Sequence, residues 1–570
     1  MKEREIFNIW CEKAIDDVDV VNELISIKEN DDAIFDAFYK DLEFGTGGLR
    51  GVIGAGTNRM NIYTVGKATQ GLAAYVNSVN KKGSVAIGYD SRIKSDVFAR
   101  HAAGIFAANG IKVYIYKELM PTPMLSYAVR YFGCDAGVVV TASHNPAKYN
   151  GYKAYGSDGC QLGLDAADYV LSIMNSVDIF NGVKYLDFEQ GLKEGIISYI
   201  DEDVINSYLV TVTAQRVRKN LDLSSLNVIY TPLHGSGNKP VRNILKMNGV
   251  KNVTVVPTQE MPNGNFPTAP YPNPEIRQAF EEALKLAKDV KPDLLLATDP
   301  DCDRVGIAVP CNGDYKLFTG NETGVLLFDY VLSSRKELNT LPENPIGVKT
   351  IVTTEMAQKI ADYYGCELKN VLTGFKFIGE VIGELEKENK HDNYVFGFEE
   401  SYGYLAGSYV RDKDAVIASM LICEMCAYYK SINVTMDEAL DNLYKKFGYF
   451  VCAQKSFECA GASGLAHIGE IMENLRTNPP MEISGSKVVK INDYNTSLSS
   501  DCINNINSKI TLPKSNVLSY FLEDGCTLIV RPSGTEPKIK LYLSAVAENK
   551  DDAGNRMDEI IKEGTVLLGF

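Results

Sequence analysis

The segment Thr141–Pro146 combines residue types that can do chemistry. It reads T-A-S-H-N-P, so Ser143 and His144 stand side by side. The apolar run from Ala136 to Val140 precedes it and is typical of a buried strand, while Pro146 prevents a helix from following. A hydroxyl and an imidazole at the end of a strand favour a loop that takes part in a reaction over one that only packs in the fold. A serine-rich turn is the alternative interpretation.

Three carboxylates follow another apolar run, Leu294 to Ala297. Asp299, Asp301 and Asp303 occupy alternate positions, and Arg304 comes directly after them. Carboxylates this close raise one another's pKa, and a hard divalent cation such as Mg²⁺ relieves the repulsion. An EF-hand loop is excluded because Arg304 stands where its sixth residue must be glycine. The loop predicts a metal site, with a solvated acidic turn as the alternative.

Residues 531–537 carry groups that bind phosphate, and they follow the predicted strand 527–530. An arginine fork and two hydroxyls can donate hydrogen bonds, and a glycine lets backbone N–H groups approach an anion. A structural turn is the alternative, but it has little use for arginine, serine and threonine together. The residues that would hold the phosphate are Arg531, Ser533, Gly534 and Thr535.

Two further loops carry weaker signals. Glu399 and Ser401 follow an apolar run and alternate, so in an extended loop their side chains point the same way. A carboxylate and a hydroxyl commonly bind sugar hydroxyls, although most glutamates are simply solvated. Thr373, Gly374 and Lys376 lie between a predicted strand and a predicted helix, where Lys376 could face a phosphate or solvent.

Alternating strands and helices must position these loops. Strand–helix–strand patterns cover residues 84–116, 227–256 and 346–372, which indicates parallel pairing and three comparable α/β domains. Charged helices are predicted for residues 1 to about 40. From about Gly448 the pattern changes to one helix, short strands and a terminal helix, which is typical of a smaller α+β domain.

Bulk composition excludes several classes of protein. At 570 residues the chain is too long for one core, and its net charge of -15 argues against nucleic acid as a partner. No run of about 18 apolar residues predicts a membrane span. The charged start lacks the apolar core of a signal peptide, and twelve cysteines then indicate reduced thiols in a cytoplasm. Cys423 and Cys426 lie in an apolar helical stretch and are predicted to be core residues.

Together, and in this order, these segments resemble the α-D-phosphohexomutase superfamily. Its pattern has a phosphoserine loop T-A-S-H-N-P, a metal loop D-x-D-x-D-R, a sugar loop G-E-x-S and a phosphate loop R-x-S-G-T-E-P. Residues 149–153 look like the N-G-[FY]-K segment of the family, and residues 44–50 look like its F-G-T-x-G-x-R loop. The length and residues 373–376 and 397–401 resemble the phosphoglucomutase and phosphopentomutase branch.

The resemblance implies the fold class. We expect three similar mixed α/β domains plus a smaller C-terminal α+β domain around a central cleft. The expected boundaries are residues 1–205, including an N-terminal helical extension, then 206–316, 317–448 and 449–570. The resemblance also implies a small phosphosugar as the partner and a monomer or dimer in the cytoplasm, with no membrane and no nucleic acid.

The resemblance also implies a mechanism. Ser143 would rest as a phosphoserine beside one Mg²⁺ per chain. A free hydroxyl of the substrate would take the phosphoryl group, so that glucose 1-phosphate and glucose 6-phosphate interconvert through glucose 1,6-bisphosphate, which also acts as the activator. Lys153 or His144 would move the proton, and Arg50 would add positive charge. The metal ligands would be a phosphoserine oxygen of Ser143 and the carboxylates of Asp299, Asp301 and Asp303.

The other loops would bind the substrate as it turns end for end between the two half-reactions. Phe377 replaces the tryptophan of the family pattern, which leaves the choice of sugar open between glucose, mannose and pentose phosphates. A Mg²⁺-dependent phosphatase and a non-catalytic sugar-phosphate-binding protein are the remaining alternatives. The expected substrate-binding residues are Arg304, Thr373, Gly374, Lys376, Glu399, Ser401, Arg531, Ser533, Gly534 and Thr535.

Overall fold

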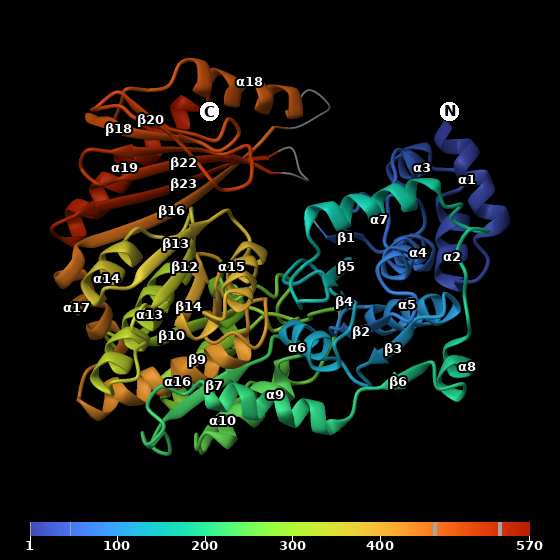
Figure 1. The fold of residues 1–570 in the computed structure, drawn as a ribbon, viewed down its shortest axis with the longest axis horizontal. Coiled ribbons are helices and arrows are strands. Elements are labelled where there is room, and N and C mark those ends of the chain that lie inside the picture. The colour runs from blue at the N-terminus through green and yellow to red at the C-terminus, as the bar shows by residue number, and fades with distance from the viewer. Residues whose placement is uncertain (1, 46, 460–463, 534–537) are drawn as a thin grey trace. The chain divides into compact units, whose positions relative to one another are not determined.

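The computed structural model describes residues 2–45, 47–459, 464–533 and 538–570 (Figure 1). These residues form two compact units, each built from several segments of the chain. The first unit contains Met1–Thr319, Ile378–Tyr394 and Ser401–Ile432, and the second contains Gly320–Phe377, Val395–Glu400 and Asn433–Phe570. Gly534 and Thr535, which are predicted to bind phosphate, lie outside the described residues.

The chain begins with three helices, as the charged pattern predicts: α1 (Lys2–Lys13), α2 (Val18–Ile27) and α3 (Asp31–Phe38). Trp10 is buried and its ring lies edge-on to Phe38 of α3. It also contacts Tyr63 at the start of α4 (Ile62–Val79), with ring centroids 5.4 Å apart. Aromatic packing therefore attaches this extension to the first α/β layer.

The first sheet has six strands in the order β1-β5-β4-β2-β3-β6. β2 pairs in parallel with β3 and β4, whereas β5 pairs antiparallel with β4 and β1, so the sheet is mixed as expected. All five residues of β4 are buried, which explains why its sequence is wholly apolar. The strands are β1 (Gly48–Val52), β2 (Ser84–Tyr89), β3 (Lys112–Ile115), β4 (Ala136–Val140), β5 (Tyr149–Gly156) and β6 (Ile197–Tyr199).

The helices around this sheet follow the predicted strand–helix–strand order. α5 (Ser95–Ala108) connects β2 to β3, and α6 (Thr122–Phe132) connects β3 to β4. The loop 141–148, which carries Ser143, lies between β4 and β5, so it projects from the carboxyl end of a buried strand. The remaining helices before the second sheet are α7 (Leu164–Ser176), α8 (Phe188–Lys193) and α9 (Glu202–Ala214).

The second sheet has five strands in the order β11-β10-β9-β7-β8. Its central strand β9 is buried throughout and pairs antiparallel with β10, so residues 299–304 form the turn of a hairpin. The strands are β7 (Asn227–Thr231), β8 (Asn252–Val255), β9 (Leu294–Thr298), β10 (Val305–Cys311) and β11 (Asp314–Phe318). The helices are α10 (Asn238–Met247), α11 (Pro257–Glu260), η1 (Arg277–Phe280) and α12 (Glu281–Val290).

The apolar helix α16 (Ala415–Ser431) completes the first unit. Cys423 and Cys426 are buried in it, which confirms that they are core residues. No single helix in the described ranges has the length and apolar character to cross a membrane, although α16 and α17 (Met436–Phe447) taken together pass that test.

The second unit holds a third α/β sheet, in which β13, β12 and β14 pair in that order. Parallel pairing of β12 with β13 confirms the third strand–helix–strand prediction. The strands are β12 (Ile346–Thr350), β13 (Glu367–Val371) and β14 (Tyr394–Glu399), and β15 (Gly403–Leu405) follows in the chain. The helices α13 (Gly320–Glu337) and α14 (Met356–Tyr364) belong to this unit. α15 (Phe375–Lys387) begins in it and continues in the first unit, which also contains the short η2 (His391–Asn393).

The C-terminal sheet, orange to red in Figure 1, runs β16-β23-β22-β21-β18-β19-β20 and carries α18 (Gly464–Thr477) and α19 (Lys550–Leu567). The prediction of short strands is wrong for β16 (Tyr449–Glu458) and β23 (Lys538–Ala547), which pair over ten residues. β16 is largely exposed at its polar second half, so its sequence lacks the alternation of a buried strand. The others are β17 (Glu482–Ile483), β18 (Ser486–Asp493), β19 (Leu498–Asp501), β20 (Ile506–Lys509), β21 (Leu518–Leu522) and β22 (Thr527–Pro532).

Candidate active site

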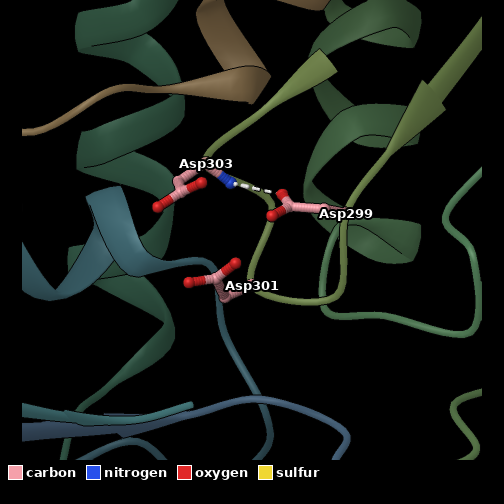
Figure 2. A group of neighbouring side chains, drawn as sticks. All are labelled: Asp299, Asp301 and Asp303. Atoms are coloured by element: carbon pink, nitrogen blue, oxygen red, sulfur yellow. Dashed lines mark hydrogen bonds between the residues drawn. The ribbon is translucent and has the colours of Figure 1, made fainter. Parts of the chain in front are cut away.

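Three buried carboxylates gather on the hairpin between β9 and β10. One oxygen from each of Asp299, Asp301 and Asp303 lies within 4.8 Å of the other two. Figure 2 shows the three side chains leaving one tight loop, with the backbone N–H of Asp303 donating to Asp299. The backbone N–H of Arg304 also donates to Asp299 Oδ1, at 3.0 Å. The loop's own backbone therefore fixes the first carboxylate before any ligand binds.

The carboxylate cluster fits a divalent cation. Asp301 Oδ1 and Asp303 Oδ1 are buried and accept no hydrogen bond from any residue that the structure describes. Burial raises the pKa of Asp299 well above its usual value, and the charges of Asp301 and Asp303 raise it further. Buried, unsatisfied carboxylate oxygens are costly, and they are the ligands that hard cations prefer. This site is compatible with a metal ion.

Ser143 lies against this cluster, although it comes from the first sheet. Its Oγ–H donates to Asp299 Oδ2 at 2.9 Å, across 156 residues of sequence. His144 Nδ1 lies 3.2 Å from the same Oγ. Ser143 adopts a left-handed backbone conformation with φ 52°, which is strained for a residue with a Cβ. Its N–H donates to Thr141 Oγ1 at 2.8 Å, and this bond helps to hold the strained turn.

Basic side chains surround the serine and the carboxylates. Lys153, on β5, places Nζ 2.8 Å from Asp301 Oδ2 and 3.4 Å from Asp303 Oδ2. Burial opposes its charge, but the two aspartates outweigh burial and raise the pKa of Lys153. Burial and the nearby charges of Arg304 and Arg50 lower the pKa of His144 well below its usual value, so its imidazole is neutral.

Two arginines named from the sequence also reach this site. Arg50, on β1, donates to Asn145 Oδ1 at 3.3 Å in the loop that carries Ser143. Arg304 directly follows the carboxylates and pairs with Glu275 at 2.5 Å. The structure thus brings eight of the named residues together in the first unit: Arg50, Ser143, His144, Lys153, Asp299, Asp301, Asp303 and Arg304.

Sequence reasoning missed Lys413, whose Nζ lies 2.9 Å from Asp303 Oδ2. It also contacts Asp412, and Asp412 accepts a hydrogen bond of 2.7 Å from the Tyr155 hydroxyl. Asp414 caps α16 by accepting from the N–H groups of Val416 and Ile417. Residues 411–414 read R-D-K-D, and a helix cap needs only one of these four charged residues. The three remaining charges were the available signal in the sequence.

Sequence reasoning also missed Arg92, which holds the loop that carries Ser143. Its guanidinium donates to the carbonyl oxygens of residues 143, 145, 146 and 149. It is paired with Asp90, which accepts a hydrogen bond of 2.6 Å from Thr141. The signal in the sequence was an aspartate and an arginine directly after the apolar strand β2. Both side chains are only 2–3% exposed, and buried charged residues require partners.

The second unit contains most of the other candidates. Glu399, at the end of β14, is buried, and so is Lys376 in the first turn of α15, which argues against a solvent-facing lysine. Burial, together with the charges of Glu400 and Glu399 and against the opposing effect of Arg531, raises the pKa of Tyr542 to about 12. The sugar-loop glutamates and Arg531 therefore lie around one tyrosine.

The remaining named residues lie in several segments of the chain. Thr373 and Gly374 directly precede α15, and Gly374 has a φ of 121° that favours glycine. Ser533 donates its N–H to the carbonyl oxygen of Lys538 at 2.7 Å. Ser401 follows β14 and belongs to the first unit.

Comparison with known proteins finds a family match along almost the whole chain. Models of the phosphoglucomutase/phosphomannomutase α/β/α domains I, II and III match residues 41–179, 206–313 and 319–447, and the model of the C-terminal domain matches residues 473–562. A phosphoglucomutase of Staphylococcus aureus is 37% identical over 530 residues, which is 92% of this chain and 93% of that protein. One of Staphylococcus haemolyticus is 37% identical and covers 90% and 92%.

Solved structures share the fold. Parafusin, a phosphoglucomutase from Paramecium, aligns with a TM-score of 0.69 at 18% identity and covers 93% of this chain and 96% of its own. A phosphoglucomutase/phosphomannomutase family protein from Burkholderia thailandensis aligns with a TM-score of 0.66 at 17% identity and covers 92% and 97%. These matches agree with three α/β domains followed by a distinct C-terminal domain.

Proposed function

Because this chain belongs to the phosphoglucomutase/phosphomannomutase family, we propose that it interconverts glucose 1-phosphate and glucose 6-phosphate. Such a mutase is an isomerase, an intramolecular phosphotransferase. The observation that carries the proposal is the contact of Ser143 Oγ with Asp299, at 2.9 Å, inside the carboxylate cluster. This contact supports Ser143 as the phosphoryl carrier, beside the carboxylates that would hold a divalent cation.

The first half-reaction transfers a phosphoryl group from Ser143 to the sugar. The free hydroxyl of the substrate attacks phosphorus, a new O–P bond forms, and the bond from phosphorus to Ser143 Oγ breaks. Mg²⁺ held by the three aspartates would neutralise negative charge that develops on the phosphoryl oxygens. The proton of the attacking hydroxyl must reach the departing Ser143 Oγ, and Lys153 or His144 moves it, since both lie at the cluster. The product is glucose 1,6-bisphosphate.

The second half-reaction requires the bisphosphate to turn and return its other phosphate to Ser143. The phosphate that is not being transferred needs a binding site, and the sugar hydroxyls need hydrogen-bond partners in both orientations. Added glucose 1,6-bisphosphate would rephosphorylate the enzyme and act as activator. We assign the phosphate-binding site to Arg531, Ser533, Gly534 and Thr535, the sugar contacts to Glu399 and Ser401, and further binding to Arg50, Arg304, Thr373, Gly374 and Lys376.

We expect the enzyme to work in the cytoplasm. All twelve cysteines are free thiols, and most of them are buried. Free thiols in this number suit a reducing compartment. A small phosphosugar is the expected partner, and a monomer or dimer is the expected assembly.

Incubation with glucose 1-phosphate, Mg²⁺ and a trace of glucose 1,6-bisphosphate tests the reaction class. We expect glucose 6-phosphate, followed with a coupled dehydrogenase. Release of inorganic phosphate at a comparable rate would indicate a phosphatase, and binding without turnover would indicate a non-catalytic protein. The matched panel contains mannose 1-phosphate and ribose 1-phosphate, and a higher kcat/KM for either would contradict the assignment of glucose.

Arg531→Ala is expected to weaken substrate binding and to raise the dependence on added glucose 1,6-bisphosphate. Loss of a hydrogen bond to a charged group costs about 1.5–3 kcal/mol, so affinity should fall about tenfold or more. An intermediate that is held less tightly also escapes more often before it has turned. Steady-state kinetics at varied bisphosphate concentration, beside a melting curve, measures both effects.

The matched control is Arg476→Ala in the same domain. Arg476 pairs with Asp493 at 3.3 Å, so its loss removes an ion pair while all the residues proposed to bind phosphate are kept. We expect the control to lower the melting temperature at most, with unchanged KM. If Arg531→Ala behaves like the control, Arg531 is only a structural residue.

A further inference from the structure

Arg92 connects the loop that carries Ser143 to a second loop, residues 261–268, from the next domain. The edge of its guanidinium donates to four backbone carbonyl oxygens of the first loop. Cζ of the same guanidinium lies over the ring of Phe266, 5.1 Å from the ring centroid. Phe266 is fully buried, so this cation–π contact is shielded from solvent. One side chain therefore contacts both loops.

The backbone of the second loop also touches the backbone around Arg92. A Cβ added to Gly264 would lie 2.5 Å from the nitrogen of Ile93 and 2.9 Å from the carbonyl oxygen of Ser91. Backbone atoms cannot move aside as a flexible side chain can. Only glycine fits at position 264, which is independent evidence that residues 261–268 are docked closely on the Arg92 loop.

His234 holds this second loop. Its Nδ1–H donates to the carbonyl oxygen of Met261 at 3.2 Å, and Nε2 accepts from the Thr268 hydroxyl at 3.0 Å. The carbonyl oxygen of His234 accepts from the N–H of Asn263 at 3.2 Å. His234 is buried, at 3% exposure, and burial lowers its pKa, which suits the neutral ring that these bonds require.

The segment Thr231–Gly237, which carries His234, also touches the carboxylate hairpin. Ser236 donates twice to the carbonyl oxygen of Pro300, from its N–H at 2.8 Å and from its hydroxyl at 2.9 Å. A Cβ on Gly235 would lie 2.5 Å from Pro300 Cα. Pro300 stands between Asp299 and Asp301, so this contact sets the position of the carboxylates.

We propose that these contacts form a bridge, from Arg92 through Phe266 and His234 to Ser236, which sets the position of Ser143 Oγ relative to the carboxylates. Arg92, Phe266 and His234 are positioning residues for phosphoryl transfer, since none of them touches the reacting atoms. The inference rests on the proposed function, because it assigns a role in that reaction. Phosphoryl transfer depends almost entirely on positioning and electrostatics, and a displacement of about 1 Å can cost roughly 100-fold in rate.

The test compares Phe266→Leu with a matched variant, Phe106→Leu. Phe106 is equally buried but lies near the C-terminal end of α5, away from the bridge. We expect Phe266→Leu to lower kcat by about tenfold with unchanged KM, and Phe106→Leu to keep kcat while losing a similar amount of melting temperature. Equal kcat values in the two variants would overturn the proposal, whether both are low or both are normal.

Arg92→Lys gives the second comparison. Lysine keeps the charge but lacks the planar fork, so it can neither serve four carbonyls nor lie flat on a ring. We expect phosphorylation of Ser143 by glucose 1,6-bisphosphate, followed by intact mass, to be about 100-fold slower than in wild type. This half-reaction is measured without isomerisation, and each variant is compared with wild type on the same donor, so a wild type that prefers another sugar still gives a valid ratio. Normal phosphorylation rates in both Arg92→Lys and Phe266→Leu would overturn the bridge while leaving the proposed function standing.

Discussion

Ser143→Ala is expected to abolish isomerisation while the protein stays folded. The substitution removes the hydroxyl that we propose as the carrier of the phosphoryl group. The structural loss is small, because only the Oγ contacts to Asp299 and His144 disappear, worth about 1 kcal/mol. The four carbonyl contacts from Arg92 are made by backbone and remain. Coupled-assay turnover and a melting curve measure the two effects.

Intact mass provides the decisive comparison for this variant. Wild type incubated with glucose 1,6-bisphosphate should carry one phosphate, and Ser143→Ala should carry none. The matched control is Ser172→Ala, an exposed serine on α7. It should keep both the phosphate and the activity. Turnover near the wild-type rate in Ser143→Ala would contradict the mechanism.

Asp301→Asn is expected to cut turnover strongly and to raise the Mg²⁺ concentration needed for half-maximal activity. It neutralises one of three carboxylates and also removes the nearer of the two carboxylate partners of Lys153, which lies 2.8 Å away. The charge of a buried lysine that keeps fewer carboxylates is less well balanced and repels an incoming cation more. We expect a loss of about 100-fold or more in activity at limiting Mg²⁺. Activity against Mg²⁺ concentration measures the effect.

A readout besides activity separates metal binding from catalysis. Mg²⁺ should raise the melting temperature of wild type, since a ligand that binds only the folded state stabilises it. The rise should be lost in Asp301→Asn and kept in Asp289→Asn, an exposed carboxylate on α12. Full activity of wild type in excess chelator would show that the three aspartates form only a turn.

Local chemistry was predictable from the sequence wherever a polar loop follows a buried strand. Residues 136–140 and 294–297 are apolar because both faces of those strands are covered. Polar residues that follow such a strand lie in the loop at its carboxyl end, where the side chains of neighbouring loop residues can lie close together. The three aspartates could be read as a group because their spacing is local. No such argument could show that Ser143 lies on Asp299, because 156 residues separate them.

Residues supplied by distant segments could not be predicted. Lys413 reaches Asp303 from the segment before α16, and a lysine beside two aspartates in sequence is equally typical of a solvated surface. The ten-residue strand β16 was missed for a similar reason. Its ladder depends on β23, which comes much later in the chain, and strand propensity is set largely by such neighbours.

The left-handed backbone at Ser143 restricts which residue can serve as the phosphate carrier. Threonine offers the same hydroxyl chemistry, yet its branched Cβ makes a φ near the observed 52° a severe outlier. Arg92 and Thr141 hold the loop in this conformation, so it cannot relax to suit a bulkier residue. The backbone conformation at residue 143 therefore favours serine over threonine on steric grounds, whether or not phosphate is bound. The same geometry would distinguish Ser143, the proposed phosphate carrier, from the other hydroxyl groups of the protein.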